Sequence, residues 1–171
     1  RAADIGCGIG RTLPLLARGF GQVHALDLSR ECLAVAERGC LAFGNIRYHH
    51  VDLAQDPAPF PPVDLVLCIN AWLMHEPGRR DAMVRHTLAC VKPGGHLLLV
   101  TPALESALFA THRLVRWQRD QGHGPKVAQQ KARREMSDLD MGIVLMDGVA
   151  TKHYLKEELE DMLPMYGLEV L

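Results

Sequence analysis

Segments of apolar, β-type residues alternate along this chain with segments whose apolar residues recur at helical spacing, and this alternation restricts the possible folds. Strands are predicted at residues 2–5, 22–26, 46–50, 65–69 and 96–101, and helices between them at 12–18, 30–43 and 79–91. Strands that alternate with helices form βαβ units, whose short connections force right-handed crossovers. The sequence therefore predicts an α/β fold with one doubly wound, mostly parallel sheet.

The composition is that of an ordinary globular domain. The chain has 171 residues, of which 48% are hydrophobic and 23% charged, so there is enough apolar surface to form a core and global disorder is excluded. The formal net charge of -1 gives no general electrostatic reason to bind nucleic acid or a membrane surface. No apolar run approaches the roughly 18 residues that a membrane span needs.

The cysteines indicate a reducing, cytoplasmic environment. They contain no C-x-x-C pair and their number is odd, so neither a disulfide framework nor a zinc site is predicted. The five positions are Cys7, Cys32, Cys40, Cys68 and Cys90.

Both ends of the chain fall within predicted strands. Only Ala2 and Ala3 precede the turn that begins at Asp4, and residues 167–171 read as a strand that has just begun. We therefore expect residues 1–171 to form a single domain that is truncated at both ends.

The segment after the fifth predicted strand differs from the βαβ pattern. Leu104, Leu108, Val115 and Trp117 indicate an amphipathic helix, residues 121–125 break it, and a second, polar helix is predicted at about 126–136. A short strand at 142–146 and a helix at 154–163 follow. Loops on this side of a doubly wound sheet face the ligand, so residues 103–150 are predicted to form a helical cap over the active site.

A glycine-rich turn, Asp4-Ile5-Gly6-Cys7-Gly8-Ile9-Gly10, joins the first strand to the first helix. Glycine lets the backbone turn tightly and lets a ligand approach where a Cβ would clash. A dinucleotide fingerprint, G-x-G-x-x-G, would need its third glycine at position 11, where Arg11 stands. This spacing disfavours an NAD-dependent dehydrogenase.

Two acidic residues end neighbouring predicted strands. Asp27 lies about 17 residues after Gly10, where a carboxylate can accept both hydroxyls of a ribose. Asp52 ends the next strand and can accept from the exocyclic amine of a purine, with Leu28 and Leu53 as apolar faces on either side of the base. Together with the glycine turn, these residues predict a site for an adenosine.

Five segments together resemble the class I S-adenosylmethionine-dependent methyltransferases, in that family's order and over roughly the first 100 residues. They are DIGCGIG (4–10), ALDLS (25–29), VDLA (51–54), VDLVLCINAWLMH (63–75) and LACVKPGGHLLLVTP (88–102). The resemblance implies a sheet of seven strands with the last one antiparallel. Beyond the five predicted strands, we expect only the opening of the sixth strand and no seventh strand in this sequence, and we do not expect the family's N-terminal helix in it.

The resemblance also implies the cofactor S-adenosyl-L-methionine, with S-adenosyl-L-homocysteine as product. By the same comparison, the glycine loop holds the methionine end, Asp27 the ribose, Asp52 and Leu53 the adenine, and the backbone around Asn70 lies beside the sulfonium. The cofactor-binding residues are thus expected to be Asp4, Gly6, Gly8, Gly10, Asp27, Leu28, Asp52, Leu53 and Asn70.

The residues that would bind the methyl acceptor are less clearly marked. His75 follows the fourth strand at the carboxyl edge of the sheet, and its intrinsic pKa suits a general base, although a role in packing its loop is the alternative. Trp72 is either a wall of the acceptor pocket or part of the core, and His153 and Tyr154 are candidates to face the acceptor. No metal site is predicted, because the sequence has no H-x-x-E or C-x-x-C cluster.

Three functions are weighed from the sequence, and aminopropyl transfer on the same fold is a further alternative that no residue supports. The first is a methyltransferase that acts on a small molecule, which the lid-sized insert favours; an N-methyltransferase of the N-P-P-Y/F type is rejected because Ala71 and Trp72 follow Asn70. The second is a non-catalytic homologue that only binds the cofactor. The third is an RNA methyltransferase that binds the RNA backbone through basic residues of the cap. A plainer explanation is that these residues form a helix face exposed to solvent. They are Arg113, Arg116, Arg119, Lys126, Lys131, Arg133 and Arg134.

Overall fold

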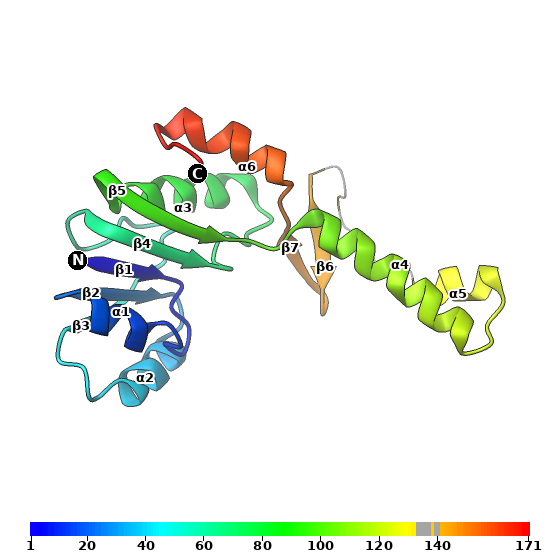
Figure 1. Ribbon diagram of the computed structural model, residues 1–171, viewed down its shortest axis with the longest axis horizontal. Helices are drawn as coiled ribbons and strands as arrows, with labels where there is room; N and C mark the ends of the chain where they lie inside the picture. Colours follow the sequence, from blue (N-terminus) through cyan, green and yellow to red (C-terminus); the bar gives the residue numbers. More distant parts are fainter. Residues whose placement is uncertain (133–137, 139–140) are drawn as a thin grey trace. The chain divides into compact units, whose positions relative to one another are not determined.

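The computed structural model describes residues 1–132, 138 and 141–171, and these fall into two compact units. The first unit contains Arg1–Trp72 and Glu76–Thr101, and the second contains Leu73–His75 and Pro102–Leu171. Figure 1 traces the elements of each unit along the chain. The longer segment of the second unit begins one residue before the predicted cap at 103–150 and continues past its predicted end.

The first unit is built on a five-stranded parallel sheet, which confirms the predicted fold class. Its strands are β1 (Ala2–Ile5), β2 (Val23–Asp27), β3 (Ile46–His50), β4 (Val63–Ile69) and β5 (Val91–Val100), in the order β3-β2-β1-β4-β5. The order reverses between β1 and β4, so the carboxyl ends of these two strands form the switch point at which open α/β sheets bind ligands. The implied sixth and seventh strands are not part of this sheet in the described residues.

Three helices cover this sheet: α1 (Leu13–Gly19), α2 (Arg30–Gly39) and α3 (Pro77–Leu88). Figure 1 shows α1 and α2 beside β2 and β3, and α3 beside β5. Ser29 caps α2, because its hydroxyl accepts the Cys32 N–H at 3.1 Å. Helix α2 ends earlier than predicted, where the Cys40 N–H turns back to the carbonyl of Glu37.

The main apolar core of the first unit lies between this sheet and helices α1 and α2. Strand β1 is buried along its whole length, as expected for a central strand covered on both faces. The buried side chains include Ala2, Leu13, Leu16, Val23, Ala25, Leu33, Ala36 and Ile46. This packing fixes the glycine turn, because it anchors both the strand before the turn and the helix after it.

Strand β5 begins earlier than predicted, and a bulge interrupts its pairing with β4 between Val91 and His96. The pairing runs from Val63 with Val91 to Leu65 with His96, so β5 carries extra residues opposite a continuous stretch of β4. A Cβ at Gly95 would lie 3.0 Å from the backbone oxygen of Asp64, so the close approach of the two strands needs glycine there.

The second unit contains two helices, a hairpin and a C-terminal helical segment. Its elements are α4 (Leu104–Asp120), α5 (Pro125–Ala132), β6 (Ile143–Met146), β7 (Val149–Lys152), α6 (Lys156–Met162) and the 3-10 helix η1 (Leu163–Tyr166). Strands β6 and β7 pair antiparallel, and the turn that joins them consists of Asp147 and Gly148, which both have positive φ. A D-G pair between two strands is the usual sequence of such a turn, but β7 was not predicted.

Three predictions for this unit need correction or lie outside the description. Residues 168–171 form no strand, since the Leu168 N–H bonds back to the carbonyl of Leu163 instead of to a neighbouring strand. Helix α6 starts later than predicted, because the backbone of Tyr154 is bonded to Pro102 and Leu104. The predicted helix at 126–136 is described only as far as Ala132, since residues 133–136 lie outside the described ranges.

No helix in the described ranges is long and apolar enough to span a membrane.

Candidate functional site

The glycine turn between β1 and α1 adopts a conformation that only glycine tolerates well. Gly6, Gly8 and Gly10 have φ values of +70°, +53° and +82°. A Cβ at Gly6 would lie 2.8 Å from the Cβ of Ala71, and one at Gly10 would lie 2.8 Å from the Cβ of Ala36. A Cβ at Gly8 would meet no protein atom within 4 Å, so this glycine leaves open space for a ligand to approach the backbone.

Asp27, at the end of β2, is tied to this turn. Its Oδ2 accepts the Gly8 N–H at 2.7 Å, and its Oδ1 accepts the Ser29 N–H at 2.8 Å. An ionised carboxylate has about four acceptor positions, so each oxygen retains capacity for a further donor. The carboxylate is therefore held in place by the backbone of two loops and can still accept the hydroxyls of a ligand.

Asp4 lies beneath the turn and is almost fully buried. Burial raises the pKa of its carboxyl to about 6; the Thr12 hydroxyl, which donates a hydrogen bond to Oδ2, opposes this rise, and the charge of Asp27 adds to it. Thr12 directly precedes α1, so this bond joins β1 to the start of the helix. The sequence analysis did not identify Thr12.

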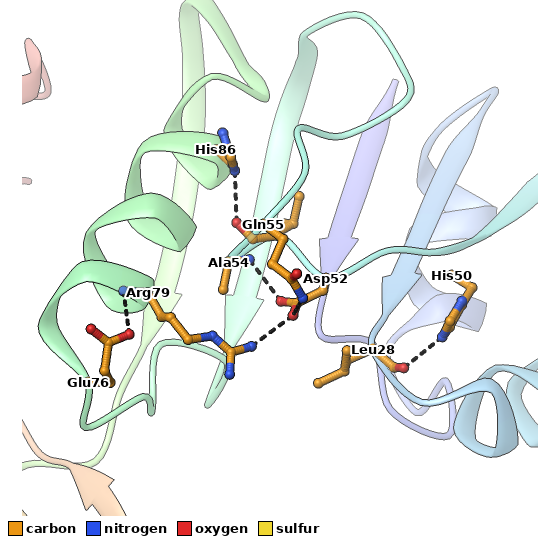
Figure 2. Close-up of polar contacts among 9 residues, drawn as sticks. Leu28, His50, Asp52, Ala54, Gln55, Glu76, Arg79 and His86 are labelled. Atoms are coloured by element: carbon orange, nitrogen blue, oxygen red, sulfur yellow. Dashed lines mark hydrogen bonds and ion pairs between the residues drawn. The ribbon is translucent and has the colours of Figure 1, made fainter.

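Asp52 follows β3, and three donors converge on its carboxylate. Oδ1 accepts the Ala54 N–H at 2.9 Å, while Oδ2 accepts from Gln55 Nε2 at 2.6 Å and from Arg79 Nη2 at 2.8 Å (Figure 2). Burial would raise the pKa of Asp52, but these hydrogen bonds and the charge of Arg79 together hold it below its usual value. Neither Gln55 nor Arg79 was predicted as part of this site.

The two leucines expected beside a purine are not equivalent. The side chain of Leu28 is open to solvent, with 57% of Leu28 exposed, whereas Leu53 is 4% exposed. Leu53 therefore packs inward and does not present a free apolar face, in contrast to the prediction. The two loops are also held through their carbonyls: His50 Nε2 contacts the Leu28 oxygen at 2.9 Å and His86 Nδ1 contacts the Leu53 oxygen at 2.8 Å (Figure 2).

Asn70 follows β4 in a left-handed conformation with φ +52°, which is uncommon for a residue other than glycine. Its N–H bonds to the carbonyl of Val100, at the end of β5, at 2.8 Å. The next residue, Ala71, is the one whose Cβ lies closest to Gly6. Asn70 thus stands next to the glycine turn at the switch point between β1 and β4.

All nine residues expected to hold a cofactor lie in the first unit, in or after strands β1 to β4. Because the strands are parallel, their carboxyl ends share one edge of the sheet. Direct contacts join Gly8 with Asp27 and place Gly6 beside the segment after Asn70. The arrangement places two carboxylates and an open glycine backbone along the same edge of the sheet.

Of the residues expected at the acceptor side, Trp72 lies in the first unit and His75, His153 and Tyr154 in the second, where a bridge between Met74 and Thr151 pairs the segment of His75 with β7. Trp72 is a core residue, because its ring is buried and its Nε1 donates to Thr87 Oγ1 at 3.2 Å. His153 and Tyr154 are also buried; His153 Nδ1 contacts the Thr151 oxygen at 3.1 Å, so neither side chain is open to an acceptor, contrary to expectation. His75 is exposed, in the segment between β4 and α3.

The described basic residues of the predicted cap lie on α4 and α5. Arg133 and Arg134 lie outside the described residues. The others are all exposed: Arg113, Arg116, Arg119, Lys126 and Lys131. Within the described ranges, no three His, Cys, Asp or Glu side chains are grouped so that they could hold a metal ion.

A family model described as a methyltransferase domain matches residues 2–95, more than half of the chain. This match covers the glycine turn, both site carboxylates and Asn70. The chain therefore belongs to the class I S-adenosylmethionine-dependent methyltransferase family.

Curated relatives include two named ubiquinone biosynthesis O-methyltransferase. The protein from Ralstonia nicotianae is 35% identical over 106 residues, which are 59% of this chain and 42% of that protein. The protein from Xanthomonas euvesicatoria is 36% identical over 112 residues, 64% of this chain and 46% of that protein. The chain thus spans less than half the length of these relatives.

Solved structures share the fold across both units. One, titled DhpI-SAM-HEP complex, matches with a TM-score of 0.62 and 21% identity over 97% of this chain and 69% of that one. The PH0226 protein from Pyrococcus horikoshii matches with a TM-score of 0.66 and 16% identity over 96% of this chain and 71% of that one. At these identities the likeness establishes the fold alone.

Proposed function

We propose that this chain binds S-adenosyl-L-methionine and takes part in transfer of its methyl group to a small-molecule acceptor, with S-adenosyl-L-homocysteine as product. The observation that carries the proposal is the bond between Gly8 and Asp27, because it joins the open glycine turn at the switch point of the sheet to a carboxylate at the end of the neighbouring strand β2. Family membership supports the same cofactor.

The residues present fit this cofactor. The space above Gly8 admits the approach of a ligand to the backbone, and Asp27 retains acceptor capacity for the two ribose hydroxyls. Asp52 retains one acceptor position for an amine of the adenine, and Asp4 places an acidic group beneath the turn that faces the methionine end. When bound, the cofactor supplies an electrophilic methyl group on a sulfonium.

The contribution of the protein is mainly orientation. Holding a nucleophile in line with a methyl group can lower the barrier by about 7–11 kcal/mol without a catalytic side chain. The left-handed backbone at Asn70 fixes the edge of the site between β1 and β4. His75 is the proposed general base: its imidazole accepts the proton of a hydroxyl acceptor as the oxygen attacks, which contributes roughly 10²–10⁴ in rate.

The relatives support a small molecule that carries a hydroxyl group as the acceptor, since both are named O-methyltransferases. In the same proposal, residues 103–150 act as the cap within a single domain that spans 1–171. The cysteines are all free thiols, which fits a reducing compartment such as the cytoplasm.

Titration calorimetry with S-adenosylhomocysteine, followed by methyl transfer from labelled cofactor to a panel of phenols and other small acceptors, tests this proposal. Binding with turnover is the expected result. Binding without turnover on any acceptor favours the non-catalytic alternative, and transfer to RNA with steeply salt-dependent binding favours an RNA substrate. Failure to bind the cofactor product contradicts the proposal as a whole.

A further inference from the structure

Of the three donors on the Asp52 carboxylate, one comes from a distant element. Ala54 and Gln55 follow Asp52 directly in the chain, whereas Arg79 reaches it from the first turn of α3. Figure 2 shows the guanidinium extending toward Asp52, with Leu28 beyond the carboxylate in that view. Arg79 therefore couples the position of α3 to the acidic residue at the end of β3.

The backbone of Arg79 is itself fixed. The carboxylate of Glu76 accepts the N–H groups of Gly78 and Arg79 at 3.0 and 2.9 Å, which caps α3 where Pro77 begins it. From this anchored turn, the half-exposed side chain of Arg79 reaches a carboxylate that is only 11% exposed. A carboxylate so shielded from water benefits from a fixed positive partner.

The donor arrangement restricts what else can bind to Asp52. An ionised carboxylate has about four acceptor positions, and three are filled. Oδ2 has two partners and Oδ1 has one, so the remaining capacity lies on Oδ1. Because an ionised carboxylate only accepts hydrogen bonds, the ligand atom that meets it must be a donor.

We propose that Arg79 holds the Asp52 carboxylate as an acceptor directed at the base, and so makes this site select a 6-aminopurine cofactor over a 6-oxopurine one. The inference rests on the proposed binding of an adenosyl cofactor. The 6-amino group of adenine donates to Oδ1, whereas the 6-oxo group of hypoxanthine opposes one acceptor with another and leaves both unpaired. Arg79 acts through Asp52 and is a positioning residue.

The test compares the affinities of S-adenosylhomocysteine and S-inosylhomocysteine by titration calorimetry. The proteins are the unaltered chain, Arg79→Gln, Arg79→Lys and a matched control, Arg85→Gln. Arg85 lies on the same helix and is exposed, so its replacement removes the same charge from α3 away from Asp52.

We expect the unaltered chain and Arg85→Gln to prefer the adenosyl ligand equally. Arg79→Gln should weaken binding of the adenosyl ligand about tenfold, because a misplaced Asp52 loses its charge-assisted hydrogen bond to the 6-amino group. Binding of the inosyl ligand, which makes no such bond, should weaken less than about threefold. The preference of Arg79→Gln for the adenosyl over the inosyl ligand should therefore be smaller than that of the unaltered chain. Arg79→Lys should recover part of it, because lysine supplies the charge but not the planar set of donors.

The inference would be overturned if Arg79→Gln lowered the affinities for both ligands to the same extent, because general damage to α3 has that effect. It would also be overturned if Arg79→Gln left both affinities unchanged. Asp52→Asn gives a second measurement that does not depend on how Arg79→Gln folds. An amide can turn its N–H toward a 6-oxo group, so this variant should shift the preference toward the inosyl ligand, and an unchanged preference would overturn the inference. If the unaltered chain binds neither ligand, the proposed function fails, and the inference fails with it.

Discussion

The backbone N–H of Gly8 donates a hydrogen bond of 2.7 Å to Oδ2 of Asp27, which links residues 19 positions apart. The bond spans from the turn after β1 to the end of β2. It holds the carboxylate in place before any ligand arrives, so less ordering is needed on binding. In this way the glycine turn both leaves space for a ligand and orients the group that recognises it.

Replacement of Asp27 tests this arrangement. Asp27→Ala should weaken S-adenosylhomocysteine binding by about 1.5–3 kcal/mol, because an ionised group that accepts ribose hydroxyls is lost. Titration calorimetry measures the effect, with the exposed Asp81→Ala on α3 as a control that should bind like the unaltered chain. Unchanged affinity in Asp27→Ala would exclude Asp27 from the binding site.

Two glycines of the turn should respond differently to substitution. Gly10→Ala should lower the thermal unfolding temperature strongly, because it combines a φ of +82° with a Cβ only 2.8 Å from the Cβ of Ala36. Gly8→Ala meets no protein atom within 4 Å and should cost only the backbone strain of about 1–2 kcal/mol.

The larger change at Gly8 separates folding from binding. Gly8→Val adds bulk above the turn, so it should abolish binding of S-adenosylhomocysteine while the chain still folds. Circular dichroism and calorimetry on the same sample distinguish the two effects. Normal affinity in Gly8→Val would show that the ligand does not pass over this glycine.

His75 is testable through its separate effects on rate and binding. If it removes a proton from the acceptor, His75→Ala should lower kcat by roughly 10²–10⁴ and leave cofactor affinity unchanged. Replacement of His96, an exposed histidine on β5, serves as the control. Full activity of His75→Ala would return His75 to a role in packing its loop.

A pair of histidines makes the stability of the first unit depend on pH. His24 Nδ1 lies 3.0 Å from His49 Nε2, and the ring of His24 stacks on Phe60 with centroids 4.1 Å apart. Burial, and then the charge of His49, lower the pKa of His24 from 6.5 to about 4. In that interval the unfolded chain binds more protons than the folded one, so stability rises with pH.

Urea unfolding at several pH values measures this dependence. The contribution of His24 should be complete above pH 6.5 and be lost as the pH falls toward about 4, with a slope of at most about 1.4 kcal/mol per pH unit. His24→Gln should flatten the slope relative to the unaltered chain. An identical slope in the two proteins would contradict the assignment.

Asp4 should act in the opposite direction. Its pKa is raised from 3.8 to about 6, so between these values the folded chain binds more protons and stability falls as the pH rises. Asp4→Asn keeps an acceptor for the Thr12 hydroxyl but cannot ionise. Its stability relative to the unaltered chain should therefore increase from about pH 4 to about pH 6, and the same unfolding series checks this sign.

Local patterns predicted much of the first unit. The bounds of β1 and β3 agree with the predicted ranges, because turn residues flank both segments and helices of clear period separate them. Strand β7 was not predicted because its sequence, VATK, is short and lacks the alternation of apolar and polar residues that marks a strand. Its pairing with β6 defines it as a strand in the structure.

Side-chain burial was the weaker part of the prediction. Tyr154 is a polar aromatic residue near a helix, a pattern that fits a binding face as well as a core. The structure buries it, with the Lys152 ammonium 4.8 Å from its ring centroid. Trp72 follows a strand end in the same ambiguous way, and its burial together with its hydrogen bond to Thr87 on α3 identifies it as core.

Spacing of glycines, acidic residues and apolar runs was enough to indicate the class of fold, a site for an adenosine and the edge of the sheet where a ligand would bind, because each of these depends on neighbours in the chain. The identity of the cofactor came from the resemblance to the methyltransferase family. The order β3-β2-β1-β4-β5 decided which distant groups meet there. Arg79 reaches Asp52 across 27 positions, and Gly8 reaches Asp27 across 19. Such pairs depend on how strands and helices pack against one another, and no local period encodes that packing.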